Sequence, residues 1–139
     1  MATNDDIVRQ AIVGSPLGRL LGVEPDALDA DRARIRLPFR SEVTTAGDLV
    51  HGGAIAALVD VAATAAVWTA ADLARNPRGT TIGFSLNFLA PARGQDLFAE
   101  ACVVQMATEN AANSATEGML AIFMFPLLGS FRFLLAQSG

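Results

Sequence analysis

The feature that most constrains the fold is an almost wholly apolar run, Ala54–Ala71, which directly follows His51-Gly52-Gly53. The run is mostly alanine and carries one charged residue, Asp60. Alanine is barely hydrophobic and a carboxylate is costly inside a bilayer, so a membrane span is disfavoured. The run therefore predicts a long buried helix over about residues 53–73, and no membrane association is expected.

Composition narrows the class of protein and its partners. The 139 residues are enough for one domain with a sizeable core, and 52% of them are hydrophobic, an excess that indicates buried subunit interfaces. The net charge of −4 leaves no basic stripe for nucleic acid. The chain has one cysteine and begins without a basic and apolar leader, which favours a reducing, cytoplasmic location.

The order of predicted elements indicates the fold class. Asp5 or Asp6 is expected to cap a short helix over residues 5–13, and Ser15–Gly18 reads as a break. Alternating or continuous apolar residues predict strands at 20–27, 33–39, 80–89, 96–105, 119–125 and 131–135, while 106–118 suits either a helix or a loop. One long helix among sequential strands predicts a single α+β domain over 1–139, with an antiparallel sheet wrapped around the helix.

The start of the predicted helix is a candidate binding site. Two glycines after a histidine permit a tight turn, and the first N–H groups of a helix point outward at the positive end of its dipole. Such groups suit an oxyanion or a polarised carbonyl. Asp60, about two turns later among alanines, is costly to bury unless it has a role.

The residues around this turn resemble a known family. The string Gly47–Asp60, with its His-Gly-Gly motif, resembles the signature of the hot-dog-fold acyl-coenzyme A (acyl-CoA) thioesterases, nearest to the phenylacetate-degradation group. Thr81–Gly94, with Asn87-Phe88-Leu89 and Pro91, resembles the next strand and turn of that group. The similarity covers about 16–104 and resumes at 129–133. Thr45 stands where the family usually has asparagine, and 105–128 departs from the family pattern.

The resemblance implies hydrolysis of an acyl- or aryl-acyl-CoA thioester, with roles for particular residues. The Gly52 N–H would polarise the carbonyl, and Asp60 would act as general base or nucleophile. His51 would orient the turn and the carbonyl, with Gly53 packed closely beside it. Thr81 would offer a hydroxyl near the attacking water. The coenzyme is part of the substrate, so the resemblance implies no separate cofactor and no metal.

Further residues are candidates for holding the substrate. Arg75, Arg78 and Arg93 flank the helix end and the following turn, where positive charge could bind the phosphates of coenzyme A. Thr45 and Thr64 complete the predicted set of substrate-binding residues. Thr64 also allows another interpretation, because it lies one turn after Asp60 and could satisfy a purely structural carboxylate.

The spacing of Gly52 and Asp60 constrains the assembly. Eight residues of helix span about 12 Å, too far for both groups to reach one carbonyl carbon. A second, antiparallel copy of the helix would bring the Asp60 of one chain to the Gly52 of the other. The implied mechanism therefore predicts a two-fold homodimer, or a dimer of dimers, with sites shared between subunits.

Other functions remain open at this stage. The first is a non-catalytic acyl-CoA-binding or sensing domain on the same fold, to which the Thr45 substitution and the atypical 105–128 segment point. A hydratase or dehydratase is a second, although His51 is the sole histidine. A purely structural protein is the third.

Overall fold

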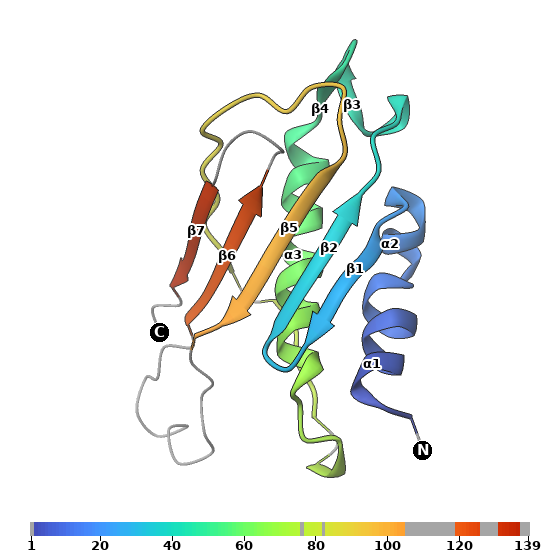
Figure 1. The fold of residues 1–139 in the computed structure, drawn as a ribbon, viewed down its shortest axis with the longest axis vertical. Coiled ribbons are helices and arrows are strands. Elements are labelled where there is room, and N and C mark those ends of the chain that lie inside the picture. The colour runs from blue at the N-terminus through green and yellow to red at the C-terminus, as the bar shows by residue number, and fades with distance from the viewer. Residues whose placement is uncertain (1, 76, 82, 105–118, 126–130, 137–139) are drawn as a thin grey trace.

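The computed structural model describes residues 2–75, 77–81, 83–104, 119–125 and 131–136, which are organised around a five-stranded sheet with the order β1-β2-β5-β6-β7. The strands are β1 (Glu24–Asp29), β2 (Arg32–Leu37), β5 (Leu97–Val103), β6 (Met119–Phe125) and β7 (Phe131–Ala136). Each pairs antiparallel with its neighbours. One long helix, α3 (Gly52–Thr69), lies across one face of the sheet (Figure 1). The predicted α+β architecture is confirmed.

Alternation along β2 explains which face of the sheet is buried. Ala33, Ile35 and Leu37 are buried in the core, while the arginines between them are half-buried and face away. The paired strand β5 repeats the pattern with Leu97, Ala99 and Ala101. Successive side chains of a strand point to opposite faces, so β2 and β5 together present one continuous apolar surface to α3.

Helix α3 supplies the other half of the core. Its buried residues include Leu58, Val59, Ala62, Ala65 and Ala66. By length and mean hydropathy (1.5) the helix could cross a membrane, but half of it is buried inside the protein. Small side chains let a helix approach a sheet closely, which explains the alanine content, and α3 is therefore the core helix of the domain.

The amino-terminal region is more helical than predicted. The predicted helix over 5–13 consists of α1 (Asn4–Ile7) and a π-helical stretch, η1 (Val8–Val13). Its cap is Thr3, in a reciprocal capping box with Asp6, so the assignment of Asp5 or Asp6 as the cap was wrong. The hydrogen bonds from Thr3 lower the pKa of the Asp6 carboxyl.

A second helix replaces the predicted break and the start of the first predicted strand. Ser15 caps α2 (Pro16–Leu21), because its hydroxyl accepts the N–H of Gly18 and Pro16 occupies the first turn. The strand predicted at 20–27 begins only at Glu24. The Ser15–Gly18 sequence predicts an interruption, but Ser15 and Pro16 are also a favourable helix start, since serine is a preferred cap and proline is tolerated in the first turn.

The polar connection between β2 and α3 contains short elements. These are the 3-10 turn η2 (Ser41–Val43) and a hairpin of β3 (Thr44–Ala46) and β4 (Leu49–Val50). At the other end of α3 the helix stops at Thr69, four residues before the predicted end, and a 3-10 turn, η3 (Leu73–Arg75), follows. The Asn4 side-chain amide donates to the carbonyls of Trp68 and Ala71, both at 2.8 Å, and so satisfies acceptors at this helix end.

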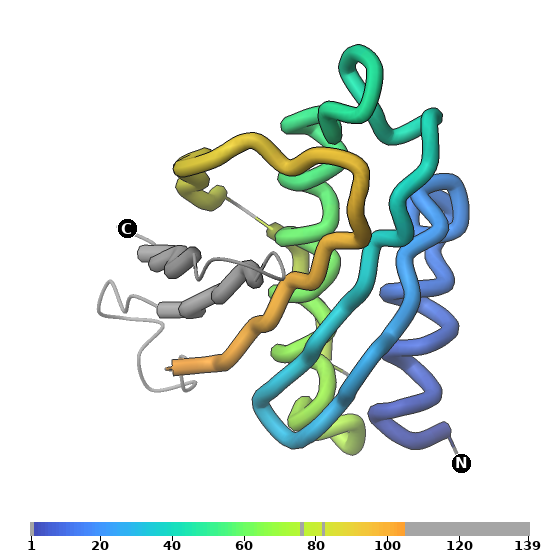
Figure 2. The backbone as a smooth tube through the Cα atoms, turned by 45° about the horizontal axis from the view of Figure 1, so that its top comes forward, coloured from blue at the N-terminus to red at the C-terminus, as the bar shows by residue number. Residues whose placement is uncertain are grey.

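The prediction of a strand at 80–89 is wrong. Residues 80, 81 and 83–89 form no strand. From Thr81, which contacts Asp60 of α3, the segment bows away from the helix, and it returns past the helix start before the chain turns into β5 (Figures 1 and 2). Alternation of apolar and polar residues reports burial on one side, not the presence of a neighbouring strand. Here the apolar side chain of Leu86 packs against the core without a strand ladder.

The strands predicted at 96–105, 119–125 and 131–135 are confirmed, within two residues at each end, by β5, β6 and β7. The helix or loop expected at 106–118 lies outside the described residues. That the whole chain forms a single domain stays a prediction.

Gly18 provides a test of the amino-terminal packing. A β-carbon on Gly18 would lie 1.9 Å from the Val13 carbonyl oxygen, whereas one on Gly79 would meet nothing within 4 Å. We expect Gly18→Ala to lower the free energy of unfolding by about 1–3 kcal/mol, as in an overpacked core. Gly79→Ala is the matched control and should change it by less than about 0.5 kcal/mol in urea denaturation. Equal stability of the two variants would contradict this packing.

Candidate functional site

The imidazole of His51 caps the start of α3. Its Nδ1 accepts the N–H of Gly53 at 2.8 Å, so Nδ1 carries no proton in this arrangement. The backbone N–H of His51 donates to the Val43 carbonyl, also at 2.8 Å. A β-carbon on Gly53 would lie 2.9 Å from Nδ1, so a glycine is needed for the ring to approach. The predicted role of His51 in shaping the turn agrees with this geometry.

In the first turn of α3, Gly52 is the residue whose backbone N–H is free to bind a ligand. The Gly53 N–H is taken by His51, and the N–H groups of Ala54 and Ile55 donate to the His51 carbonyl. Within the described part of the chain, no acceptor is recorded for the Gly52 N–H. This donor lies at the positive end of an 18-residue helix, where it is suited to bind a negatively charged or polarised oxygen.

Asp60 accepts a hydrogen bond from a residue that is distant in the sequence. The Thr81 hydroxyl donates to Asp60 Oδ1 at 2.5 Å, across 21 residues of sequence. Two predicted site residues are therefore brought together. No hydrogen bond joins Thr64 to Asp60 among the residues described, so the alternative in which Thr64 satisfies the carboxylate is not seen here. The second oxygen, Oδ2, has no recorded partner in the same part of the chain.

Gly52 and Asp60 lie on the same helix but do not converge in one chain. They are eight residues apart in α3, or about 12 Å along its axis. The donor and the carboxylate thus form two half-sites at different heights on the helix. A site containing both requires a second copy of the chain.

The hairpin β3–β4 is tied to the turn before β5. Asp48 pairs with Arg93 at 2.8 Å, and its carbonyl accepts the Gly94 N–H at 3.0 Å. The Val50 N–H donates to the Ala92 carbonyl at 2.9 Å. These bonds fix the chain immediately before His51, and sequence reasoning did not identify Asp48 as part of this support.

The remaining predicted substrate residues are spread over the surface. Thr45 is exposed on β3, and Thr64 is half-buried on α3. Of the three arginines, Arg93 is paired with Asp48 and Arg75 with Asp72 at 3.2 Å. Arg78 is exposed and has no ion pair among the described residues. These positions do not form one cluster in a single chain.

Phe88 lies in the segment that resembles the family, but it is not among the predicted site residues. A methyl group on Gly52 would lie 3.4 Å from Cζ of Phe88, so the ring lies against the start of α3. The residues in contact are 36 positions apart, and no sequence pattern of one chain indicates such a pair. The ring is 56% exposed, which is high for phenylalanine.

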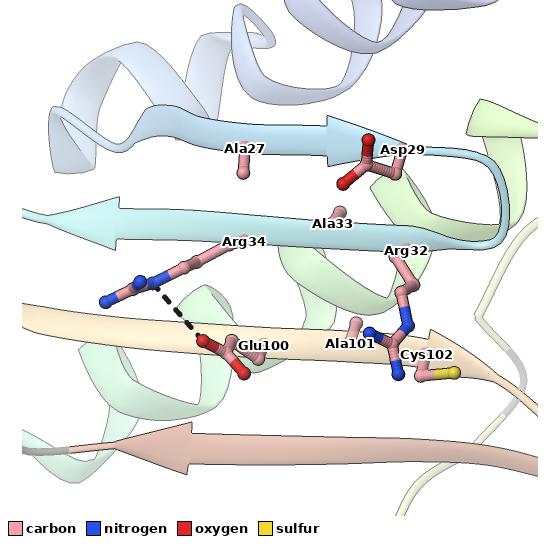
Figure 3. A pocket seen from close by; sticks show the side chains of 8 residues that line it. All are labelled: Ala27, Asp29, Arg32, Ala33, Arg34, Glu100, Ala101 and Cys102. Carbon is pink, nitrogen blue, oxygen red and sulfur yellow. Dashed lines mark ion pairs between the residues drawn. The ribbon is translucent and has the colours of Figure 1, made fainter.

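A separate groove lies on the outer face of the sheet, away from α3 (Figure 3). Its volume is about 280 Å³, and its charged lining residues include Arg32, Arg34 and Glu100. Arg34 pairs with Glu100 at 3.4 Å and with Asp26 at 3.3 Å. The groove contains none of the predicted catalytic residues, and its charges largely compensate one another, so the α3 face is the better candidate. No cluster of potential metal ligands occurs among the described residues.

The cap at His51 predicts a stability effect. Removing the side chain in His51→Ala leaves the Gly53 N–H without its acceptor, and losses of helix caps cost about 1 kcal/mol. His51→Asn, which keeps an acceptor in a good capping residue, should recover most of that loss in thermal or urea unfolding. If the alanine and asparagine variants were equally stable, the ring would not be acting as the cap.

Comparison with known protein families gives a match over the start of α3. Residues 47–109 match the model of the thioesterase superfamily. A protein of Halobacterium salinarum named "Putative esterase" is 36% identical over 89 residues, which cover 62% of this chain and 58% of that protein. The chain thus spans less than two thirds of the length of this relative.

Comparison with solved structures supports the fold over nearly the whole chain. A thioesterase family protein from Silicibacter pomeroyi aligns with a TM-score of 0.75 at 22% identity, covering 98% of this chain and 99% of the other. The Escherichia coli PaaI protein from the phenylacetic acid degradation operon aligns with a TM-score of 0.67 at 17% identity, covering 96% and 86%. At such identities the likeness concerns the fold.

Proposed function

We propose that this chain, which matches the thioesterase superfamily over residues 47–109 and shares its hot-dog fold with a solved thioesterase family protein, hydrolyses an acyl- or aryl-acyl-CoA thioester to the free acid and coenzyme A. The observation that carries the proposal is that α3 holds two chemically complementary groups, each forming half of a site. One is the N–H of Gly52, which has no recorded acceptor in the described chain. The other is the Asp60 carboxylate, hydrogen-bonded by Thr81 at 2.5 Å.

The chemistry follows from these two groups. The thioester oxygen accepts the Gly52 N–H, which draws electron density from the carbonyl carbon and stabilises the oxyanion of the tetrahedral intermediate. Asp60 accepts a proton from a water molecule, whose oxygen attacks that carbon. The C–S bond then breaks, and the coenzyme A thiolate leaves and takes up the proton held by Asp60, which restores the carboxylate. The substrate supplies the coenzyme, so the reaction as written needs no further cofactor.

The Thr81 hydrogen bond supports the role of Asp60 as a base. Thr81 occupies Oδ1 and holds the carboxylate in one orientation, which leaves Oδ2 to accept the proton of water. A carboxylate held by a hydroxyl from another segment loses little further freedom in the transition state. Thr81 is in this proposal a positioning residue that also lies near the water.

The separation of about 12 Å between the half-sites makes a homodimer part of the proposal. In a two-fold dimer with antiparallel α3 helices, the Asp60 of one subunit faces the Gly52 of the other, and two equivalent sites result. A dimer of dimers would repeat this unit. The small residues beside Asp60, Ala56 and Ala57, are only half-buried in the single chain and would allow two helices to approach closely. We place the activity in the cytoplasm.

We predict that Asp60→Asn lowers kcat by at least about 100-fold with acyl-CoA substrates, because losing a general base typically costs two to four orders of magnitude. Thr81→Val should give a smaller loss, and Thr81→Ser, which keeps the hydroxyl, should stay near wild type. The kcat of each variant is measured from the release of coenzyme A from a panel of acyl-CoAs. When a thiol reagent is used, the signal from the Cys102 thiol is subtracted.

The control is the oligomeric state and unfolding midpoint of each variant, which these substitutions of similar size should leave close to wild type. Turnover of Asp60→Asn close to that of wild type would rule out the mechanism. If wild type bound acyl-CoA without turning over any substrate, the protein would be an acyl-CoA-binding domain on this fold instead.

A further inference from the structure

Phe88 lies against the donor of the proposed site. Three atoms at the tip of its ring, Cζ, Cε1 and Cε2, would be 3.4, 3.6 and 3.9 Å from a methyl group placed on Gly52. A methyl group on Gly52 would therefore meet the ring tip at contact distance, so the ring lies beside the Cα of Gly52 and leaves space there of about one methyl group. The positively polarised edge of the ring faces the turn that carries the Gly52 N–H.

The exposure of Phe88 is not explained by core packing. Leu86, two residues earlier, packs against the core, whereas Phe88 remains 56% exposed and Phe84 39% exposed. Phe88 thus lies at the surface, with one edge of its ring beside Gly52 and the rest of the ring exposed to solvent. A ligand at this place could make two contacts, an apolar one with the Phe88 ring and a hydrogen bond with the Gly52 N–H.

The position of Phe88 is linked to that of Thr81. The segment runs antiparallel to α3, because Thr81 contacts Asp60 while Phe88, seven residues later, contacts Gly52, eight residues before Asp60. The two contacts pin the segment beside both half-sites of the helix. The Phe88 ring and the Gly52 N–H therefore lie at the same end of α3, where a ligand bound to the N–H can also pack on the ring.

We propose that Phe88 determines acyl-group specificity, forming a wall on which an aromatic or long apolar acyl group packs when its carbonyl oxygen binds the Gly52 N–H. This inference rests on the proposed function. The acyl group is chosen over the coenzyme arm because the exposed face of the ring is apolar, whereas the arm contains amides and phosphates that seek polar partners. Aromatic acyl groups gain most, because they can add ring–ring contact to burial.

The test measures kcat and KM of wild type, Phe88→Ala and Phe88→Leu with benzoyl-CoA, hexanoyl-CoA and acetyl-CoA. Phe88→Ala should raise KM for benzoyl-CoA about tenfold, with kcat within about threefold, as for loss of an apolar pocket contact. Acetyl-CoA has almost no acyl group to contact the ring, so its KM should change less than about twofold. Phe88→Leu should keep most of the affinity for hexanoyl-CoA but not for benzoyl-CoA.

The matched control is Leu89→Ala, which removes a neighbouring apolar side chain that is 68% exposed and should leave all three KM values unchanged. An equal loss with the three substrates, or a shift from dimer to monomer in sedimentation, would assign Phe88 to structure or to the subunit interface and overturn the proposal. No change with benzoyl-CoA would overturn it as well.

Failure of the proposed function is detected separately, as absence of turnover by wild type with every thioester. The specificity role is then judged by equilibrium binding, as the preference for benzoyl-CoA over free coenzyme A measured by calorimetry. A preference that is present in wild type and lost in Phe88→Ala supports the role of Phe88. A preference that is absent from wild type, or equal in both proteins, contradicts it.

Discussion

The packing of α3 against β2 and β5 is the contact on which the rest of the structure depends. Leu58, Val59 and Ala62 on the helix, with Ile35 and Leu37 on β2, are almost completely removed from solvent. Burial of this kind stabilises by roughly 25 cal/mol per Å² of apolar surface. Because the helix is anchored along its length, Gly52 and Asp60 keep a fixed separation and orientation, and the proposed chemistry relies on that rigidity.

Both ends of this helix are also tied to other segments. His51 joins the start of α3 to Val43 through its backbone and to Gly53 through its ring, while Asn4 holds the carbonyls of Trp68 and Ala71 at the far end. The segment that follows returns along the helix and contacts Asp60 and Gly52 through Thr81 and Phe88. A polar site of few residues is in this way supported by hydrogen bonds from distant parts of the chain.

Local patterns predicted the elements that have a local cause. The alternation in residues 33–37 identified β2 and its buried face, and the apolar run identified α3, because both patterns report burial directly. The pattern at 80–89 was misread, since alternation does not show whether a neighbouring strand exists. The family motif predicted Asp60, Gly52 and His51 as catalytic residues and Thr81 as a nearby hydroxyl, and these roles remain predictions. The ties made by Asn4, Asp48 and Phe88 join residues 36 to 67 positions apart, and the sequence of one chain carries no local signal for them.

The central claim is that two chains compose each active site, and subunit complementation tests it most directly. Gly52→Pro removes the proposed donor N–H at the first helical position, where proline is tolerated, and His51 already has the extended backbone that precedes proline. Asp60→Asn removes the carboxylate. When the two inactive variants are unfolded together and refolded as a mixture, half of the dimers are mixed, and each mixed dimer contains one intact shared site. The account predicts recovery of about a quarter of wild-type turnover. Wild type taken through the same unfolding and refolding is the control; if it regains activity while the mixture turns over substrate no faster than either variant alone, the two groups do not combine across subunits and the account is contradicted.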